Sequence, residues 1–172
     1  MKNLKKLIFG CLVLLTVASC KKDNDGGSGG TAADGVIQAK IGGSSWTSVK
    51  MSTSAQYVGA GRSLTILGVD ASGKTINIII NNYDGTTGTW AIPNSAGGIG
   101  VVASYIEASL GSSKTWVAPY SGSGVIGEIK VSEFSKTGNV KGTFKFKARN
   151  QSDNSDFKDV TEGSFNVKVN SF

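Results

Sequence analysis

Cys20 is the residue whose chemistry the sequence defines best. It follows Val17-Ala18-Ser19, a run of small residues at the end of the apolar stretch Leu7–Ala18. A basic start, an apolar segment and small residues at the cleavage point are the three parts of a secretory signal. Because a Cys comes directly after the small residues, these four residues have the form of a lipobox. We therefore expect residues 1–19 to be a lipoprotein signal peptide and Cys20 to be acylated.

The segment after Cys20 has the composition of a tether. The apolar stretch Leu7–Ala18 before Cys20 is shorter than the roughly 20 residues that a membrane-spanning helix needs. A single acyl chain binds a membrane only reversibly. The lipobox resembles those of bacterial lipoproteins, and this resemblance implies several acyl chains on Cys20. Residues 21–25 (Lys-Lys-Asp-Asn-Asp) resemble short charged export signals of surface lipoproteins, and residues 26–30 (Gly-Gly-Ser-Gly-Gly) form a flexible linker. We expect residues 20–35 to attach the domain to the outer membrane at the cell surface, with its periplasmic face as the alternative.

The absence of histidine excludes several classes of enzyme. The 172 residues contain no His and two Cys, and Cys11 lies in the predicted signal peptide. Ser-His-Asp and Cys-His catalysis within one chain, and zinc held by His or Cys, are therefore excluded. Loss of the signal peptide removes three lysines and lowers the formal charge from +6 to +3. This charge is too small to indicate nucleic-acid binding, and nothing indicates a cofactor.

Four basic residues alternate along one segment, namely Lys141, Lys145, Lys147 and Arg149. Alternation places them on one face of a strand, with about 7 Å between positions i and i+2. We call these four residues the basic stripe, and they are candidates for binding an anionic glycan or another anionic polymer. The alternative is a solvated sheet face, on which lysine also discourages edge pairing.

Trp116 and Tyr120 flank a loop and are the aromatic residues that we expect to be most exposed. An exposed aromatic ring can stack on the apolar face of a sugar ring. The alternative is that the aromatic residues of this chain supply core packing, which is their commonest role. Both residues are therefore candidate ligand-binding residues beside the basic stripe.

Carboxylates are the remaining candidates for catalysis and metal binding. Glycoside hydrolysis requires two acids held about 5 to 9.5 Å apart, and nothing in the sequence pairs the strand-borne acids. The loop from Asn150 to Asp159 contains oxygen ligands of the kind that calcium prefers. Its spacing fits no EF-hand, and Asp and Asn are ordinary turn residues, so we predict no metal site. The residues in question are Glu107, Glu128, Glu133 and Glu162 on strands, and Asp153, Asn154, Asp156 and Asp159 in the loop.

The elements that must position these residues are β-strands. Glycine supplies 24 of the 172 residues, about twice its usual share, and good helix formers are scarce. We predict that residues 36–172 form one all-β domain, an antiparallel β-sandwich or barrel-like fold of about nine strands. The segment 101–110 also has a helical interpretation, but strand is favoured. The predicted strands are residues 37–41, 64–69, 75–83, 89–92, 101–109, 114–117, 125–131, 140–149 and 165–169.

The last three predicted strands form an antiparallel meander with one buried and one solvated face. Their alternation predicts that Phe144, Phe146, Phe165 and Val167 are core residues. Among the nearby acids, we expect only Glu128 to share a face with Lys130.

The order of several short motifs resembles a family. These motifs are the lipobox, an early strand followed by Trp46, the run Gly88-Thr89-Trp90, and the closing runs at residues 142–146 (Gly-Thr-Phe-Lys-Phe) and 162–167 (Glu-Gly-Ser-Phe-Asn-Val). Together they resemble small lipoproteins of the Bacteroidota that share a β domain of unknown function. The resemblance implies no catalytic residues.

We therefore expect a non-enzymatic binding or accessory module of the cell envelope, with glycan as the expected ligand class. One alternative is a hydrolase that acts on envelope or dietary polysaccharide through carboxylates. The other is a structural subunit of a surface assembly.

Overall fold

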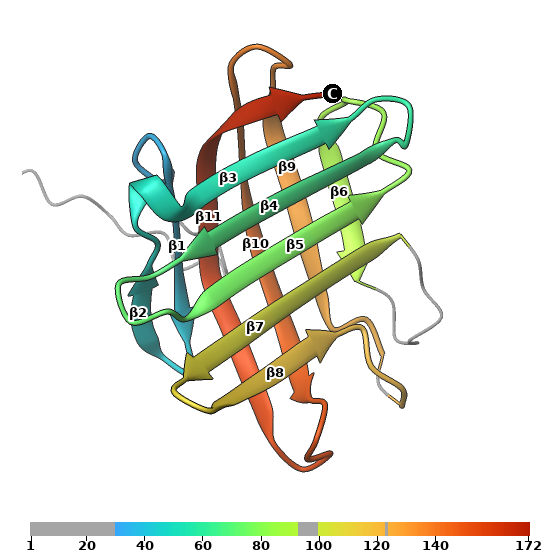
Figure 1. Cartoon of the computed structure of the whole chain (residues 1–172). Coiled ribbons are helices and arrows are strands. Elements are labelled where there is room, and N and C mark those ends of the chain that lie inside the picture. The colour runs from blue at the N-terminus through green and yellow to red at the C-terminus, as the bar shows by residue number, and fades with distance from the viewer. Residues whose placement is uncertain (1–29, 93–99, 123) are drawn as a thin grey trace, which may run out of the picture.

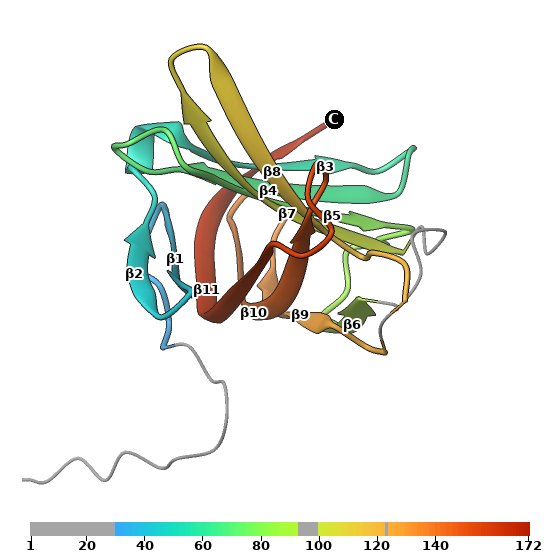
Figure 2. The same cartoon turned by 90° about the horizontal axis from the view of Figure 1, so that it is seen from below.

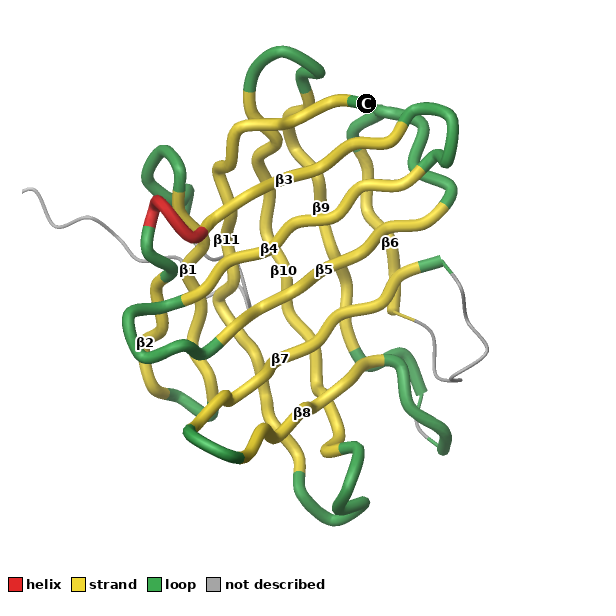
Figure 3. The backbone as a smooth tube through the Cα atoms, viewed as in Figure 1, coloured by secondary structure: helices red, strands yellow, loops and turns green. Residues whose placement is uncertain are grey.

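The chain folds almost entirely into β-strands. The computed structural model describes residues 30–92, 100–122 and 124–172. Within these ranges there are eleven strands, one short 3-10 helix and no α-helix (Figure 3). None of the described segments is a helix of the length and hydropathy needed to cross a membrane. The all-β prediction is confirmed, with eleven strands in place of about nine.

The elements, in chain order, are β1 (Val36–Ile41), β2 (Ser44–Thr47), η1 (Lys50–Ser52), β3 (Thr53–Val58), β4 (Ser63–Val69), β5 (Thr75–Asn81), β6 (Gly88–Ile92), β7 (Val101–Ser109), β8 (Ser112–Ala118), β9 (Gly127–Phe134), β10 (Asn139–Asn150) and β11 (Phe157–Ser171).

The strands form one sheet that folds into two layers (Figures 1 and 2). The front layer has the order β3-β4-β5-β7-β8, and the back layer has the order β2-β1-β11-β10-β9-β6. Two corners join the layers, because the end of β11 pairs in parallel with β3 and the end of β10 pairs with β8. The strands of the two layers cross steeply in Figure 1, as in orthogonal sheet packing. The result is a barrel-like sandwich.

The core lies between the two layers and is built by alternation. In β10, every second residue from Val140 to Ala148 is buried, while the residues of the basic stripe face outward. Phe144, Phe146, Phe165 and Val167 are all at most 3% exposed, so their prediction as core residues is confirmed. The eleven strands and the core residues all lie between Ala32 and Ser171. Within the described residues, the eleven strands thus surround one core.

Two strands were not among the predicted ones. β2 follows β1 across a two-residue turn in which Gly42 and Gly43 both have positive φ, at 55° and 84°. Such a turn requires φ > 0 at both central positions, which glycine adopts without strain. β3 escaped prediction because only Ala55 and Tyr57 alternate as apolar, buried residues within it. Conversely, residues 101–109 form the strand β7 that the sequence favoured over a helix.

A β-bulge in β9 corrects the prediction about the nearby acids. Lys141 is opposite Glu133 and Gly142 is opposite Val131, so Ser132 is an extra residue in β9. A bulge of this kind shifts the alternation of the residues that follow it. Glu133 therefore reaches the outer face together with Glu128, contrary to the expectation that only Glu128 would do so. Both carboxylates then face the basic stripe.

Candidate functional site

The basic stripe lies on the outer face of the back layer, and two of its four residues are paired with acids. Lys141 Nζ is 2.8 Å from a carboxylate oxygen of Glu133, and Lys145 Nζ is 3.0 Å from one of Glu128. Both acids are on β9, directly across from their lysines. The pairing relieves the repulsion that four neighbouring cations would otherwise suffer.

The other two members of the stripe lie over aromatic rings. Lys147 Nζ is 5.1 Å from the ring centroid of Phe157, and the Arg149 guanidinium is 5.0 Å from that of Tyr120. The two rings are themselves in contact, with centroids 5.6 Å apart. An arginine or lysine held over a ring within about 6 Å is attracted by the negative face of the π system. We call these four residues the cation–aromatic cluster.

Phe157 is the member of this cluster that the sequence did not identify. It is 39% exposed, which is unusual for a large apolar residue at the start of a strand. The only signal in the sequence was an aromatic residue directly after the polar loop that precedes β11.

A groove of about 700 Å³ runs beside this cluster on the outer face. Its wall is the segment before β9, including the exposed Val125, and its floor is formed by outward residues of β9, β10 and β11. We call this hollow the outer groove. Its volume lies within the range of about 300–1,000 Å³ that is typical of ligand sites. The side chains that carry its chemistry are Tyr120, Glu128, Lys145, Lys147, Asp159 and Thr161.

The outer groove therefore collects part of the predicted site. Lys145, Lys147 and Tyr120 line it, and Arg149 contacts it through the ring of Tyr120. Lys141 lies outside the groove lining and holds Glu133. With Lys145 and Lys147 opposed by Glu128 and Asp159, the charges of the groove balance. This composition suits a neutral or zwitterionic polar ligand better than a strongly anionic one.

Trp116 is not exposed, and that expectation is wrong. It is 1% exposed, and its ring packs 5.7 Å from that of Tyr105 in the core. Trp116 lies opposite Tyr105 in the β7–β8 hairpin, so the pairing of these strands turns both rings inward. Most of the remaining aromatic residues are also core, since Trp46, Tyr57 and Tyr83 are at most 5% exposed.

The strand-borne acids form ion pairs with lysines. Each of the four forms an ion pair with a different lysine, at distances between 2.8 and 3.6 Å. Residues 151–156 form the loop between β10 and β11, so Asp159 of the expected loop lies in β11. Asp153 accepts hydrogen bonds from the hydroxyl and backbone N–H groups of Ser155, which lower the pKa of its carboxyl group. Among the described residues, no group of three or more His, Cys, Asp or Glu is arranged to hold a metal ion.

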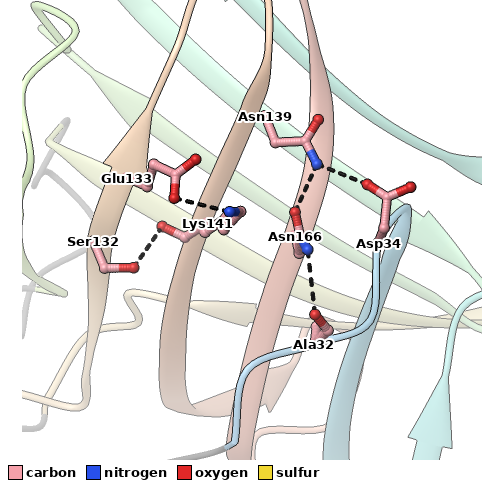
Figure 4. Close-up of polar contacts among 7 residues, drawn as sticks. All are labelled: Ala32, Asp34, Ser132, Glu133, Asn139, Lys141 and Asn166. Carbon is pink, nitrogen blue, oxygen red and sulfur yellow. Dashed lines mark hydrogen bonds and ion pairs between the residues drawn. The ribbon is translucent and has the colours of Figure 1, made fainter.

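A polar network fixes the point where the tether joins the domain (Figure 4). The Asn139 amide donates to a carboxylate oxygen of Asp34 at 2.8 Å and to the side-chain oxygen of Asn166 at 2.7 Å. Asn166 donates in turn to the carbonyl of Ala32 at 3.4 Å, and Ala32 is buried. Lys50 also donates to Asp34, and this bond is the main reason that the pKa of Asp34 lies below its ordinary value. Residues 32–34 are thus bound to β10 and β11.

The fold and the outer groove define the class of this protein, a barrel-like β-sandwich domain with a charge-balanced, largely apolar groove on one outer face. The family model described as domain of unknown function DUF6252 matches residues 33–168. The chain therefore belongs to the DUF6252 family. No curated protein and no solved structure matches the chain.

Proposed function

We propose that this protein is a lipid-anchored, non-enzymatic module of the bacterial cell envelope that binds glycan in the outer groove. The anchor part of the proposal rests on the lipobox at Cys20 and on the glycine-rich segment between it and the domain. The resemblance of several short motifs to Bacteroidota lipoproteins supports a position on the outer membrane, facing outward. Gly30 lies ten positions after Cys20, and an extended chain of that length reaches about 35 Å.

The observation that carries the glycan proposal is the composition of the outer groove. A sugar ring presents an apolar face and a rim of hydroxyl groups. The groove offers Tyr120 and Val125 as apolar contacts, and the lysines and carboxylates on its floor as donors and acceptors. Hydrogen bonds to charged groups are the strong ones. The Arg149 guanidinium over the Tyr120 ring holds this anchor in place before a ligand arrives, which lowers the entropic cost of binding.

Binding to a glycan array tests the groove. We expect a protein of residues 30–172 to bind a defined set of the arrayed glycans. Tyr120→Ala should reduce this binding at least about tenfold, because aromatic anchors dominate binding energies. Lys141→Ser is the matched control, since Lys141 lies on the same strand face but outside the groove lining. Equal loss in both variants, or no retained glycan, contradicts the proposal. Retention confined to sulfated or phosphorylated glycans and abolished by salt would instead assign the face to anionic polymers.

The hydrolase alternative rests on one observation, which is that Glu128 and Asp159 both line the outer groove. Glu128 is held by Lys145 at 3.0 Å, and this ion pair must break before the carboxyl group can act on a substrate. Assay of the retained glycans for new reducing ends separates the two functions. Formation of product by the wild type, and its loss in Glu128→Gln or Asp159→Asn, would show that the protein is an enzyme and not a binding module.

Cell fractionation tests the anchor independently of the groove. We expect the wild-type chain in the outer membrane and sensitive to protease added to whole cells. Cys20→Ser should release the protein from the membrane or block its processing. Membrane attachment and normal processing of this variant would contradict the lipid anchor.

A further inference from the structure

A second recess lies at the end of the barrel where the two layers separate. It has a volume of about 210 Å³ and is formed by the β1–β2 hairpin, the turn between β4 and β5, β7, and the start of β11. These segments come together at one end of the molecule in Figure 1. We call it the end recess. Its lining residues used below are Ile41, Trp46, Lys74, Tyr105, Glu107 and Lys158.

Two indole groups near the end recess lack a hydrogen-bond acceptor. Trp46, which lines the recess, and Trp116, which packs on Tyr105, are 5% and 1% exposed. The Nε1 atom of each is buried, and no acceptor for either exists among the described residues. A buried donor without an acceptor is destabilising, because folding removes its hydrogen bonds to water and provides no replacement. An unpaired buried donor in a native structure therefore needs an explanation. One explanation is that a bound ligand supplies the acceptor.

Charged side chains surround the same recess in equal numbers. Lys158 Nζ is 3.6 Å from a carboxylate oxygen of Glu107 and 4.8 Å from the ring centroid of Trp116. Tyr105 donates its hydroxyl hydrogen to Glu107 at 2.9 Å. Lys74 and Asp70 add one charge of each sign, and Asp70 accepts three hydrogen bonds within its own turn. The recess is therefore neutral overall, with both donors and acceptors.

We propose that the end recess binds a single neutral sugar unit, such as the terminal residue of a glycan. Its volume lies below the roughly 300 Å³ at which drug-sized sites begin, so it accepts one ring and not an oligosaccharide. Glu107 accepts a hydrogen bond from a ring hydroxyl and Lys158 donates to one, while the side chain of Trp46 forms part of the recess wall. Trp46 Nε1 is buried in the free protein and donates to the sugar once this wall shifts on binding. Ile41 and Tyr105 supply apolar surface. The balance of charge disfavours a phosphate or a uronic acid.

This proposal deepens the glycan binding proposed above but uses different residues. The outer groove and the end recess share no lining residue. Failure of one site therefore leaves the other testable. Tyr120→Ala serves as the groove variant, and Glu107→Gln serves as the recess variant because it retains an acceptor for Tyr105 while removing the charge.

Indole nitrogen resonances report on the end recess directly. The chain contains three Trp, and all lie within residues 30–172. Labelling with ¹⁵N-tryptophan therefore gives three indole signals, which Trp→Phe substitutions at each position assign. The probes are the methyl glycosides of glucose, galactose and mannose, and N-acetylglucosamine, up to about 50 mM, because single sugars bind at millimolar strength near −4 kcal/mol.

We expect at least one of these probes to shift the Trp46 signal to saturation, with affinity reduced at least fivefold in Glu107→Gln and unchanged in Tyr120→Ala. Trp46→Phe, which keeps the bulk of the ring and loses the donor, should weaken binding as seen from the Trp116 signal. No response at Trp46 to any probe overturns the proposal. A shift that is confined to Trp90, or that is equal in wild type and Glu107→Gln, also overturns it. A response lost in Tyr120→Ala would return the sugar to the outer groove.

Discussion

The two faces of β10 are held by different forces. On the inner face, Phe144 and Phe146 are nearly fully buried, and their rings lie 6.2 Å apart within the core. On the outer face, Lys141 and Lys145 keep a third or more of their side chains exposed and are held by ion pairs. Burial of a Phe side chain contributes roughly 1.5–3 kcal/mol, whereas an exposed ion pair contributes about 0–1 kcal/mol. The inner face therefore contributes more to the stability of the fold than the outer face does.

Phe146→Ala should have the largest effect of the substitutions on β10. Removing a buried Phe costs about 3–5 kcal/mol, because the apolar contacts are lost and a cavity remains. Lys147→Ala, one position further on and exposed, should cost less than about 1 kcal/mol, the value of its contact with the Phe157 ring. Chemical denaturation of both variants measures the difference. Similar losses in both would contradict the difference between the two faces, and a larger loss in Lys147→Ala would mean that the faces are exchanged.

Gly142→Ala should also destabilise the protein, although it adds only one methyl group. A Cβ at Gly142 would overlap the backbone carbonyl oxygen of Lys130 and the ring of Phe165. Because a backbone carbonyl cannot move aside cheaply, we expect a loss of about 1–3 kcal/mol. Gly43→Ala is not a suitable control because of its positive φ, whereas Gly100→Ala adds a Cβ into open space. A Gly142→Ala variant as stable as the wild type would mean that β9 and β10 can move apart to make room for the added methyl group at little cost.

Asn139→Ala tests the polar network that binds residues 32–34 to β10 and β11. The substitution leaves the mostly buried Asn166 oxygen without its donor and removes one hydrogen bond from Asp34. We expect a loss of about 1–2 kcal/mol and faster hydrogen exchange at residues 32–36. Asn154→Ala, in an exposed turn, is the control. Unchanged exchange in Asn139→Ala would mean that residues 32–34 are held by their backbone contacts alone.

The Lys141–Glu133 pair should contribute little, as an exposed ion pair on a solvated face. A double-mutant cycle to Ala at both positions should give a coupling of about 0.2–1 kcal/mol, decreasing as salt screens the charges. A larger coupling that salt does not change would place this pair among the interactions that specify the fold.

The smallest expected effect is a pH response at Asp34. Its pKa lies below the ordinary value of 3.8, chiefly through the hydrogen bond from Lys50 and then the one from Asn139. The stabilisation from this carboxylate is therefore complete above about pH 4 and is lost as pH falls through the lowered pKa. Side-chain amide signals of Asn139, followed by NMR through this range, should shift in the wild type and stay constant in Asp34→Asn. A shift that persists in Asp34→Asn would assign the titration to another group.

Local patterns in the sequence determined much of the inner face. Strict alternation in β10 and β11 identified Phe144, Phe146, Phe165 and Val167 as core, because successive side chains of a strand point to opposite sides. The same periodicity located most strands and favoured β7 over a helix. The lack of His excludes Ser-His-Asp and Cys-His catalysis by side chains of this sequence alone, because the required side chain is absent from it. Each of these inferences depends only on composition or on residues close together in the chain.

The tertiary structure decided everything that depends on contacts between distant segments. The bulge at Ser132 brought Glu133 to the outer face, because a one-residue shift exchanges the two sides of a strand. The pairing of β7 with β8 buried Trp116, and the outward turn of Phe157 completed the cation–aromatic cluster. The end recess joins residues as far apart as Ile41 and Lys158. Their spacing in the sequence does not predict that they lie close together. Their proximity results from the packing of the two layers and not from the preference of any local segment.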